Sequence, residues 1–451
     1  MNLARMLKRR AEAGKPIRVG LIGAGKFGSM FLAQARVTAG IHVAGIADLS
    51  PERARAALAA TGWDAEAAVA PGLDAAFASG RTALLEDGAA LASADGIDVV
   101  IEATGHPRAG IAHAMAAIDH VKHVVMVTVE ADVLAGPLLA ARARKAGVVY
   151  SMAYGDQPAL VCEMVDWAQA CGFRVVAAGK GTKYLPAYHA STPETVWGHY
   201  GLTPEQARAG GMNPQMFNSF LDGTKSGIEM AAIANATGLS AREDGLLFPP
   251  VGVDALAQDL APRAAGGVLD ASGVVEVVSS VERDGTDVPR DLRWGVYVVI
   301  EPQDGDARGD YARRCFSEYG LVTDREGRRT ALYRPCHMIG FELGVSVAAA
   351  ALRGEPTGVG EAFNADVVAV AKRPLASGET LDGEGGRTVW GRLTTARRSL
   401  ADGLLPIGLA QGVTLRSGIA EGEPVRWADV LVDDGDIAVR TRREMEAAFG
   451  G

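Results

Sequence analysis

The sequence of 451 residues contains few cysteines and few aromatic residues, and it has no long apolar run. Its four cysteines show none of the spacings typical of metal ligands and predict free thiols in a reducing cytoplasm. No stretch approaches the ~18 uninterrupted apolar residues of a membrane span, and no signal peptide is evident near the first residues. We therefore expect a cytoplasmic protein without a metal site. The cysteines are Cys162, Cys171, Cys315 and Cys336.

Long blocks of positive charge are also absent. The formal net charge is -9, with 45 Lys and Arg against 54 Asp and Glu. Lys8-Arg9-Arg10 is a short basic run on an amphipathic pattern, which predicts a surface helix. Because no basic block is long enough to follow a phosphate backbone, we expect no nucleic-acid partner. The length of the chain indicates two or three domains.

Glycine, in contrast, is abundant, and one cluster of glycines has a specific spacing. The apolar residues 19–22 lead into a Gly-x-Gly-x-x-Gly motif, and a helical pattern follows over 29–38. The first glycine makes a tight turn, the second lets the backbone approach a pyrophosphate, and the third lets helix and strand pack closely. The motif predicts a dinucleotide site at a helix N-terminus. Its predicted cofactor-binding residues are Gly23, Gly25, Lys26, Phe27 and Gly28.

Asp48 ends the next predicted strand, residues 41–48, and indicates which dinucleotide binds. A carboxylate there can accept hydrogen bonds from both ribose hydroxyls, whereas it would repel a 2′-phosphate. Arg53 and Arg55 either lie on a solvated helix face, which we favour, or reduce this repulsion. NAD(H) is therefore favoured as the cofactor, and NADP(H) stays an alternative.

Strands and helices alternate over the first 150 residues or so, which predicts a doubly wound parallel sheet of the Rossmann type. Residues 63–95 show helical periodicity without a strong strand. Ligands of such a sheet bind beyond the carboxyl ends of its strands. Further strands are expected at 98–105, 123–129 and 148–154, and helices at 51–60, 108–118 and 132–146.

Four residues near the ends of these strands are further candidates for binding the cofactor. Thr104 and Gly105 are expected to contact the ribose of the nicotinamide half. His106 is either a proton donor or a residue that stabilises the turn before a proline. Glu130, which ends the strand 123–129, is expected near the reacting carbon. The alternative for Glu130 is an acid in the first turn of the following helix, a role that suits Asp132 better.

From residue 156 the pattern changes to that of an α+β domain with substrate contacts and a subunit interface. Lys180 and Lys183 follow a predicted strand, 174–179, in a glycine-rich loop. Two lysines in such a loop can bind an anionic group, and a desolvated lysine can protonate a carbonyl oxygen. The other predicted elements are helices at 159–171, 224–237 and 340–352 and strands at 273–281 and 294–300.

The helix 224–237 carries the second group of candidate residues. Lys225 and Glu229 lie four residues apart on one face, beside alanines that leave room for a ligand. They form either a helical ion pair or part of a catalytic or substrate site, and we favour the site because a buried pair needs a reason. Asp222 and Thr224 precede them and are included as catalytic and substrate-binding candidates. Arg334 and His337, in Tyr-Arg-Pro-Cys-His, bind a phosphate or carboxylate or are structural.

The last hundred residues contain a weak internal repeat. Residues 367–381 are echoed by residues 418–425, since both contain an apolar residue, Ala, one further residue and Gly-Glu, as in Leu-Ala-Ser-Gly-Glu and Ile-Ala-Glu-Gly-Glu. The repeat is too short for a solenoid and predicts a small β-rich module with glycine turns. The domain boundaries expected from these patterns are 1–155, 156–360 and 361–451.

At these residues the chain resembles the homoserine-dehydrogenase-like oxidoreductases with a C-terminal SAF module. This group includes the DXR-like enzymes, an alternative type of 1-deoxy-D-xylulose 5-phosphate reductoisomerase. In the terminal module the resemblance rests on Lys372-Arg373-Pro374-Leu375 and Gly422-Glu423. Elsewhere it rests on Gly-Leu-Ile-Gly-Ala-Gly at 20–25, Val-Glu-Ala-Asp-Val at 129–133, Ala-Gly-Lys-Gly at 178–181, Asp-Gly-Thr-Lys at 222–225 and Glu-Met-Ala-Ala-Ile-Ala-Asn-Ala-Thr-Gly-Leu at 229–239.

The resemblance implies a homodimer or higher homo-oligomer and, for the DXR-like members, NADPH-dependent reduction of a rearranged sugar phosphate. The chain departs from this pattern at Asp48, and it has Glu130 where homoserine dehydrogenases have a lysine. We therefore expect an NAD(P)-dependent oxidoreductase that acts on a small polyhydroxylated or anionic carbonyl or hydroxy compound. The alternatives are a DXR-like reductoisomerase, a lyase or dehydratase with tightly bound NAD, and a non-catalytic dinucleotide sensor.

Overall fold

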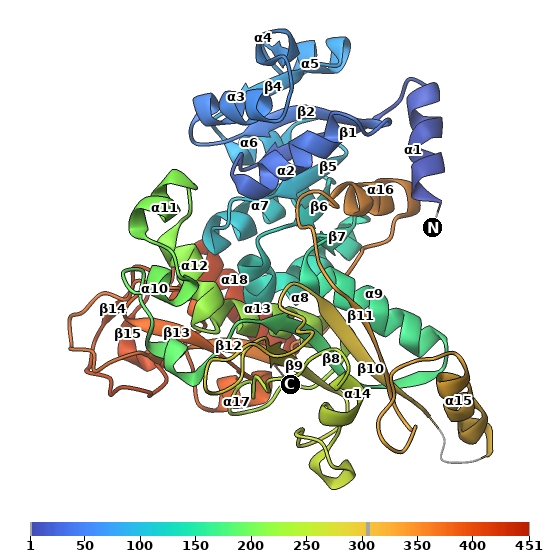
Figure 1. The fold of residues 1–451 in the computed structure, drawn as a ribbon. Helices are drawn as coiled ribbons and strands as arrows, with labels where there is room; N and C mark the ends of the chain where they lie inside the picture. Colours follow the sequence, from blue (N-terminus) through green and yellow to red (C-terminus); the bar gives the residue numbers. More distant parts are fainter. Residues whose placement is uncertain (1, 304–306, 451) are drawn as a thin grey trace. The chain divides into compact units, whose positions relative to one another are not determined.

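The computed structural model describes residues 2–303 and 307–450, which form two compact units (Figure 1). The first unit contains the described residues of 1–160, 338–361 and 440–448. The second unit contains those of 161–337, 362–439 and 449–451. Helices α9 (Gln157–Ala170) and α18 (Ile437–Phe449) contribute to both units.

The first unit is built around a seven-stranded sheet in which every neighbouring pair is parallel, with the order β3-β4-β2-β1-β5-β6-β7. The Rossmann-type α/β class predicted from the sequence is therefore confirmed. Residues 63–95, where the sequence showed helical periodicity without a strong strand, contain β3 and β4, which are too short to produce a clear sequence pattern. The strands are β1 (Ile17–Ile22), β2 (Ile41–Ala47), β3 (Val69–Ala70), β4 (Thr82–Leu85), β5 (Val99–Glu102), β6 (His123–Met126) and β7 (Tyr150–Met152).

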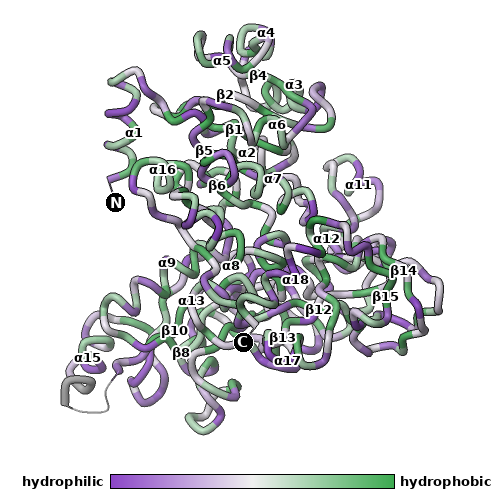
Figure 2. Tube along the Cα trace, turned by 180° about the vertical axis from the view of Figure 1, so that it is seen from behind, coloured by the Kyte–Doolittle hydropathy of each residue, from purple (hydrophilic) through white to green (hydrophobic). Residues whose placement is uncertain are grey.

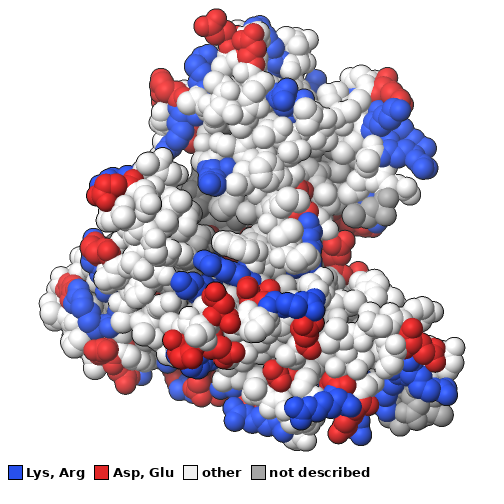
Figure 3. All heavy atoms as spheres, in the orientation of Figure 1, with Lys and Arg blue, Asp and Glu red and all other residues white. Residues whose placement is uncertain are grey.

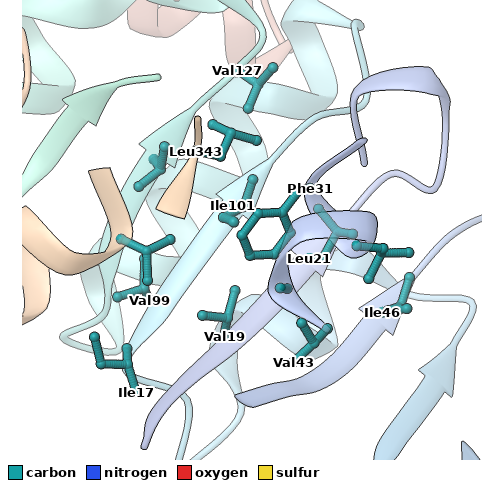
Figure 4. Close-up of a cluster of buried hydrophobic side chains, with 14 of the residues drawn as sticks. Ile17, Val19, Leu21, Phe31, Val43, Ile46, Val99, Ile101, Val127 and Leu343 are labelled. Carbon is teal, nitrogen blue, oxygen red and sulfur yellow. The ribbon is translucent and has the colours of Figure 1, made fainter. Parts of the chain in front are cut away.

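Apolar side chains from the central strands form the core of this unit (Figure 4). Val19, Leu21 and Ile101 have no exposed surface, as expected for parallel strands that are covered on both faces. Helix α16 (Gly344–Arg353) contributes Val347 to the same core. The sequence pattern placed this helix in the second domain, but an apolar helix face alone does not show which core it covers.

The helices of the first unit surround this sheet, and α1 shows how the sequence places them. Its buried residues Leu3 and Leu7 are four apart on one face, so α1 alternates apolar and polar segments in Figure 2. Lys8 and Arg9 are exposed. Figure 3, in the orientation of Figure 1, shows a cluster of basic side chains at the upper right, over the region of α1. The predicted surface helix is confirmed. The helices are α1 (Leu3–Glu12), α2 (Lys26–Ala35), α3 (Pro51–Ala60), α4 (Ala65–Ala68), α5 (Leu73–Ser79), α6 (Gly88–Ser93), α7 (Pro107–Asp119), α8 (Val129–Ala146) and α16.

The second unit contains a four-stranded sheet with the order β11-β10-β8-β9. Its central strand β8 runs through Lys180, so the predicted loop at 180–183 is wrong in its first three residues. The strand requires glycine at positions 179 and 181. A Cβ at either position would lie about 2 Å from a backbone oxygen of a neighbouring segment. The strands are β8 (Phe173–Thr182), β9 (Val274–Ser279), β10 (Val296–Pro302) and β11 (Thr330–Arg334).

Helix α13 (Thr224–Thr237) is the most buried helix of the second unit, because it packs against β8 and β9 and also against β12 (Ala365–Ala371) and β13 (Val389–Thr395) (Figure 1). Its bounds match the prediction. The remaining elements are α10 (Val196–Tyr200), α11 (Pro204–Ala209), α12 (Pro214–Leu221), α14 (Leu256–Asp259), α15 (Ala307–Glu318), α17 (Ala396–Ala401), β14 (Thr414–Leu415) and β15 (Val430–Leu431).

The C-terminal part of the second unit is a small β module, as predicted. The two copies of the internal repeat pair with each other, since the backbones of Leu375 and Ile419 exchange hydrogen bonds of 2.9 and 3.0 Å. Each copy then turns at a glycine with positive φ, Gly378 at 82° and Gly422 at 79°. The repeat is therefore two equivalent strand–turn units that face each other. Among the described helices of the chain, none has the length and apolar character needed to cross a bilayer.

Candidate functional site

The glycine turn after β1 has the geometry of a phosphate-binding loop. Gly23 has a φ of 98°, and a Cβ there would lie 2.5 Å from the carbonyl oxygen of Ala103. A Cβ on Gly28 would lie 2.3 Å from the carbonyl oxygen of Gly23, so only glycine lets α2 pack this closely on the turn. Gly25 has nothing within 4 Å of its Cβ position, and it begins α2 without a side-chain cap. The N-terminus of α2, with Lys26 first, therefore faces open space that suits a pyrophosphate.

Asp48 follows β2 and is held by protein donors at both of its oxygens. Oδ2 accepts the N–H of Ala24 at 2.9 Å, and Oδ1 accepts the N–H of Ser50 at 3.0 Å and Nε of Arg53 at 2.9 Å. Burial acts to raise the pKa of Asp48, but these hydrogen bonds outweigh it and hold the pKa below its usual value. Arg53 is exposed, as expected for a solvated helix face, and it also forms an ion pair with Asp48.

The loop after β5 is held by hydrogen bonds to a buried acid, Glu102, that the sequence analysis missed. Glu102 has no exposed surface and accepts the hydroxyl of Thr104 at 2.6 Å and the hydroxyl of Thr128. The hydroxyl of Thr128 in turn accepts the N–H of Gly105 at 3.0 Å, and that of Thr104 accepts the N–H of His106 at 3.2 Å. A charged residue at the end of the otherwise apolar strand β5 was the signal for this network. Thr104, Gly105 and His106 are exposed at the carboxyl edge of the sheet.

Glu130 lies in a different element from the one predicted. Strand β6 ends at Met126, and α8 begins at Val129, so that Glu130 and Asp132 both belong to the first turn of α8. The alternative of a first-turn acid is therefore the correct local structure for Glu130. Asp132 is buried, accepts the hydroxyl of Tyr150 at 3.0 Å, and burial raises its pKa to about 7.

The residues of the first unit fit a dinucleotide. Phosphates need exposed backbone donors with room to approach, and the open N-terminus of α2 at Gly25, Lys26 and Phe27 provides both. The ribose needs an acceptor, and Oδ2 of Asp48 has one protein donor and capacity for a second hydrogen bond. These residues would hold the adenosine and pyrophosphate parts of the cofactor.

In the second unit, Lys180 of β8 and Glu229 of α13 form a buried ion pair through Nζ and Oε2. Their side chains are only 7% and 3% exposed. Among the described residues Glu229 is the one hydrogen-bonding or ionic partner of the Lys180 ammonium group, which can donate three hydrogen bonds. The partner of Glu229 is thus a lysine from another element, and the pair leaves donors available at Lys180.

Ser226 adds a second unsatisfied group one turn before Glu229. Its hydroxyl oxygen is buried and has no hydrogen-bond partner among the described residues. Because residues three apart on a helix are neighbours, Ser226 and Glu229 share a face of α13. A buried hydroxyl without a partner is unfavourable in a protein interior unless a ligand or water completes its hydrogen bonds. Lys225, the residue directly before Ser226, is half-buried.

Asp222 and Thr224 are fully buried and hold the start of α13. Oδ1 of Asp222 accepts the N–H of Thr224 at 2.9 Å, and its Oδ2 accepts Nζ of Lys372 at 2.7 Å. The hydroxyl of Thr224 accepts the N–H of Gly391 at 2.8 Å. Burial acts to raise the pKa of Asp222, more strongly than the ammonium group of Lys372 lowers it.

Lys183, three residues after Lys180, lies beside Arg293, another residue that the sequence analysis missed. The ammonium group of Lys183 donates to the carbonyl oxygen of His199 at 2.7 Å. Burial and, next, the charge of Arg293 lower its pKa. Arg293 itself lies over the rings of Tyr200 and Trp294, at 5.9 and 5.0 Å. Two adjacent cations with one lowered pKa form a place where a substrate anion is favourable.

Arg334 and His337 lie at the other edge of the same sheet. Val296 of β10 pairs with both Lys180 and Arg334, which places Arg334 two strands from Lys180, about 10 Å away by the usual strand spacing. His337 lies just beyond β11, where Nδ1 donates to the carbonyl oxygen of Trp294 at 2.7 Å. The structure therefore brings Lys180 and Glu229 together directly and leaves Arg334 and His337 nearby on one sheet.

Three family models match consecutive parts of the chain. A model described as an oxidoreductase family with an NAD-binding Rossmann fold (GFO_IDH_MocA) matches residues 17–154. The catalytic domain of oxidoreductase DRL matches residues 155–343, and the SAF domain matches residues 366–431. The chain therefore combines an NAD-binding Rossmann domain of the GFO/IDH/MocA type, a DRL-type catalytic domain and a SAF domain, and these models describe oxidoreductases. The expected SAF module and the resemblance to a DRL-type catalytic domain are confirmed at the level of these domains.

Solved structures are similar to this chain at low identity. An NAD binding oxidoreductase from Klebsiella pneumoniae is 22% identical over 39% of this chain and 44% of its own, with a TM-score of 0.28. An oxidoreductase from Agrobacterium radiobacter, in complex with NAD+, L-tartaric acid and magnesium, is 17% identical over 38% and 45%, with a TM-score of 0.27. A scyllo-inositol dehydrogenase from Lactobacillus casei is 13% identical over 38% and 47%, with a TM-score of 0.27. This chain thus spans less than half of each of these proteins, and no curated protein matches its sequence.

Proposed function

We propose that this oxidoreductase transfers a hydride between nicotinamide and a small polyhydroxylated or anionic carbonyl or hydroxy compound that binds at Lys180 and Glu229. The observation that carries the proposal is their buried ion pair, which leaves donors of Lys180 unused among the described residues. The Ser226 hydroxyl, on the face of α13 that carries Glu229, also has no partner in the described parts of the chain. A substrate oxygen placed between these groups would satisfy both of them. When it is bound, nicotinamide supplies or accepts the hydride.

Lys180 is proposed to move the proton that accompanies hydride transfer. Its ammonium group donates a hydrogen bond to the carbonyl oxygen and gives up a proton as negative charge develops there. The carboxylate of Glu229 pairs with Nζ and orients it toward the substrate oxygen. In the oxidative direction the neutral amine accepts the hydroxyl proton. Lys225, which is half-buried on α13 with Glu229, orients the substrate.

The anionic part of the substrate is proposed to bind at Lys183 and Arg293. The lowered pKa of Lys183 shows that its ammonium group is not fully compensated by its surroundings, and an anion would provide this compensation. Arg334 is a further cation on the same sheet. Asp222 and Thr224 are proposed to hold α13 in place, because their polar atoms are already bonded to Lys372 and Gly391.

A second candidate is the reduction of a rearranged sugar phosphate by a DXR-like reductoisomerase. It is favoured by the match of residues 155–343 to the DRL catalytic domain. The cations at Lys183 and Arg293 suit the phosphate group of such a substrate. It differs from the first candidate in that a carbon-skeleton rearrangement precedes the reduction.

For the cofactor we propose a preference for NAD(H) with use of NADP(H). Oδ2 of Asp48 retains capacity for a ribose hydroxyl, which favours NAD(H). Arg53 is half-exposed and partly neutralises the carboxylate, so that a 2′-phosphate meets an arginine as well as an aspartate.

A substrate panel tests the function. Hydroxy acids, polyols, aldoses and sugar phosphates would be assayed with NADH, NADPH, NAD+ and NADP+, by the absorbance of reduced nicotinamide. We expect turnover with one class, lost in Lys180→Ala and Lys225→Ala while the Kd for NADH is unchanged. Turnover that survives in Lys180→Ala would contradict the assignment of the site. Rearrangement of a sugar phosphate before reduction would identify the second candidate.

A further inference from the structure

The SAF domain is attached to the start of the catalytic helix α13, and one side chain makes the central contact. The side chain of Lys372, in the SAF domain just after β12, is 2% exposed. Its ammonium group donates to Oδ2 of Asp222 at 2.7 Å, to the carbonyl oxygen of Ser191 at 2.8 Å and to that of Gly386 at 2.7 Å. All three donors of this lysine are therefore used, in contrast to those of Lys180.

Asp222 transmits this contact to the helix. Its Oδ1 accepts the N–H of Thr224, the first residue of α13, and its carbonyl oxygen accepts Nδ1 of His189 at 2.7 Å. Because a carbonyl oxygen only accepts, Nδ1 of His189 carries the proton and Nε2 is left to accept the hydroxyl of Tyr184 at 2.8 Å. Asp222 is thus fixed from three directions.

The same domain makes further contacts with the first turn of α13 and the loop before it. Gly391 of β13 donates its N–H to the hydroxyl of Thr224, and a Cβ on Gly391 would lie 2.8 Å from the methyl carbon of Thr224. The ring of Trp390 stacks on that of His189, with centroids 3.8 Å apart. The SAF domain therefore determines where α13 starts and in which direction it runs.

A buried ion pair of this kind is poorly explained by stability. Removing two charges from water costs free energy, and well-packed apolar residues in the same place are often as stable or more stable. What the pair provides instead is position. Asp222 accepts the N–H of Thr224, the first residue of α13, and Lys372 ties the same carboxylate to the carbonyl oxygens of Ser191 and Gly386. The helix that begins there carries Lys225 in its first turn and Glu229 one turn later.

We propose that Lys372 is a positioning residue, through which the SAF domain holds the first turns of α13 so that Lys225 and Glu229 are aligned for the reaction. The SAF domain is then a working part of the catalytic unit and not a separate interaction module. This inference rests on the proposed function for its kinetic consequences, whereas its structural consequence, order in the first turn of α13, does not depend on that function.

The test compares the double variant Asp222→Asn/Lys372→Met with wild type, with Lys372→Arg and with Arg387→Gln as a matched control. The double variant removes both charges together and so avoids an unpaired buried charge. Arg387 links the same SAF segment to Glu194 through an exposed ion pair that does not contact α13. Each variant would be examined by thermal unfolding, NADH binding, steady-state kinetics and hydrogen exchange of the amides of residues 224–229.

We expect the double variant to fold and to bind NADH as the wild type does, with kcat lowered on the order of 100-fold, a loss typical of catalytic groups displaced by about 1 Å. Exchange of the amides of 224–229 should be faster in it, and Lys372→Arg should recover part of kcat. Arg387→Gln should match the wild type in all measurements. Wild-type kcat and exchange in the double variant, or an equal loss in Arg387→Gln, would overturn the proposal.

The two proposals fail in different ways. If the site at Lys180 is assigned wrongly, Lys180→Ala keeps turnover, whereas the exchange of α13 still responds to Lys372. If the role of Lys372 is assigned wrongly, exchange in α13 is unchanged in the double variant, whereas Lys180→Ala is still inactive. A double variant that unfolds at a much lower temperature than the wild type would show that the pair serves stability and would also overturn the inference.

Discussion

The cofactor site of the first unit is formed mainly by backbone groups, whereas the ion pair of the second unit is formed by side chains. The cofactor site consists mostly of backbone, with Gly23, Gly25 and Gly28 within six residues and one side chain, Asp48, after the next strand. The proposed catalytic pair consists of side chains, and Lys180 and Glu229 come from different elements. A site made of backbone requires glycines at fixed spacing, whereas a site made of side chains requires that distant parts of the chain meet.

The largest effect that this comparison predicts is at Lys180. We expect Lys180→Met to lower kcat about 1,000-fold or more, because loss of a proton donor and of charge stabilisation removes roughly 4 kcal/mol from the transition state. The Kd for NADH should not change. Stopped-flow or steady-state assays and fluorescence titration with NADH would measure the two quantities.

Lys183→Met is the matched control for this prediction. It removes a lysine from the same segment, but one that we assign to the substrate anion. Its KM should therefore rise with a smaller change in kcat, since loss of binding to the ground state and transition state alike affects KM. Equal losses of kcat in the two variants would show that the two lysines do not have separate roles.

Titration of a buried acid should affect the first unit through stability and not through its site. Burial raises the pKa of Asp132 to about 7, compared with 3.8 for an unperturbed carboxyl. Between about pH 4 and pH 7 the unfolded chain loses this proton and the native protein keeps it, so native stability falls as pH rises and reaches its lowest contribution above pH 7. A shift of about three pKa units limits this contribution to about 4 kcal/mol.

Asp132→Asn isolates this contribution. The amide oxygen can still accept the hydroxyl of Tyr150, and the group no longer ionises. Relative to the wild type, the variant should gain stability as pH rises from 4 to 8, with unchanged NADH binding. Urea unfolding at both pH values measures the difference, and equal shifts at the two values would contradict the pKa assignment.

Substitution of two glycines of the cofactor site should have different effects, one on NADH binding and one on stability. A Cβ at Gly25 meets nothing within 4 Å, so Gly25→Ala should keep its unfolding temperature while the methyl group hinders the pyrophosphate. We expect NADH binding to weaken on the order of 10- to 100-fold, or about 1.4 to 2.8 kcal/mol. A Cβ at Gly28 meets the oxygen of Gly23 at 2.3 Å, so Gly28→Ala should lower the unfolding temperature itself. Equal unfolding temperatures for the two variants would contradict this reading of the turn.

The sequence predicted the first unit more completely than the second, and particular residues show why. The turn at Gly23 and the bounds of α3 follow from neighbouring residues, so a local pattern was enough. The short strand β4 and the placement of α16 were missed because they depend on what packs against them. In the second unit Gly179 and Gly181 looked like a loop, because only the structure shows the backbone of β9 and of Leu292 passing close to them.

The candidate site shows the same limit. Lys180 and Glu229 were both predicted as site residues, but no local pattern could show that they pair across β8 and α13. The partnership of Asp222 with Lys372, 150 residues away, was also hidden. Arg293 and Glu102 were missed altogether, although a glutamate in the apolar run of β5 was a usable signal.

The smallest predicted effect concerns Asp48, the one side chain of the cofactor site. Two variants separate the effect of its negative charge from that of the positive charge of Arg53. Asp48→Ser removes the acceptor for the ribose and leaves Arg53 without its ion pair, so the ratio of kcat/KM for NADPH to that for NADH should rise about 10-fold. Arg53→Gln keeps Asp48 and removes the cation, so the same ratio should fall by a similar factor. Steady-state kinetics with both cofactors measure this. An unchanged ratio in Arg53→Gln would mean that Arg53 has no part in selecting the cofactor, and the preference would then depend on Asp48, which the N–H groups of Ala24 and Ser50 hold in place.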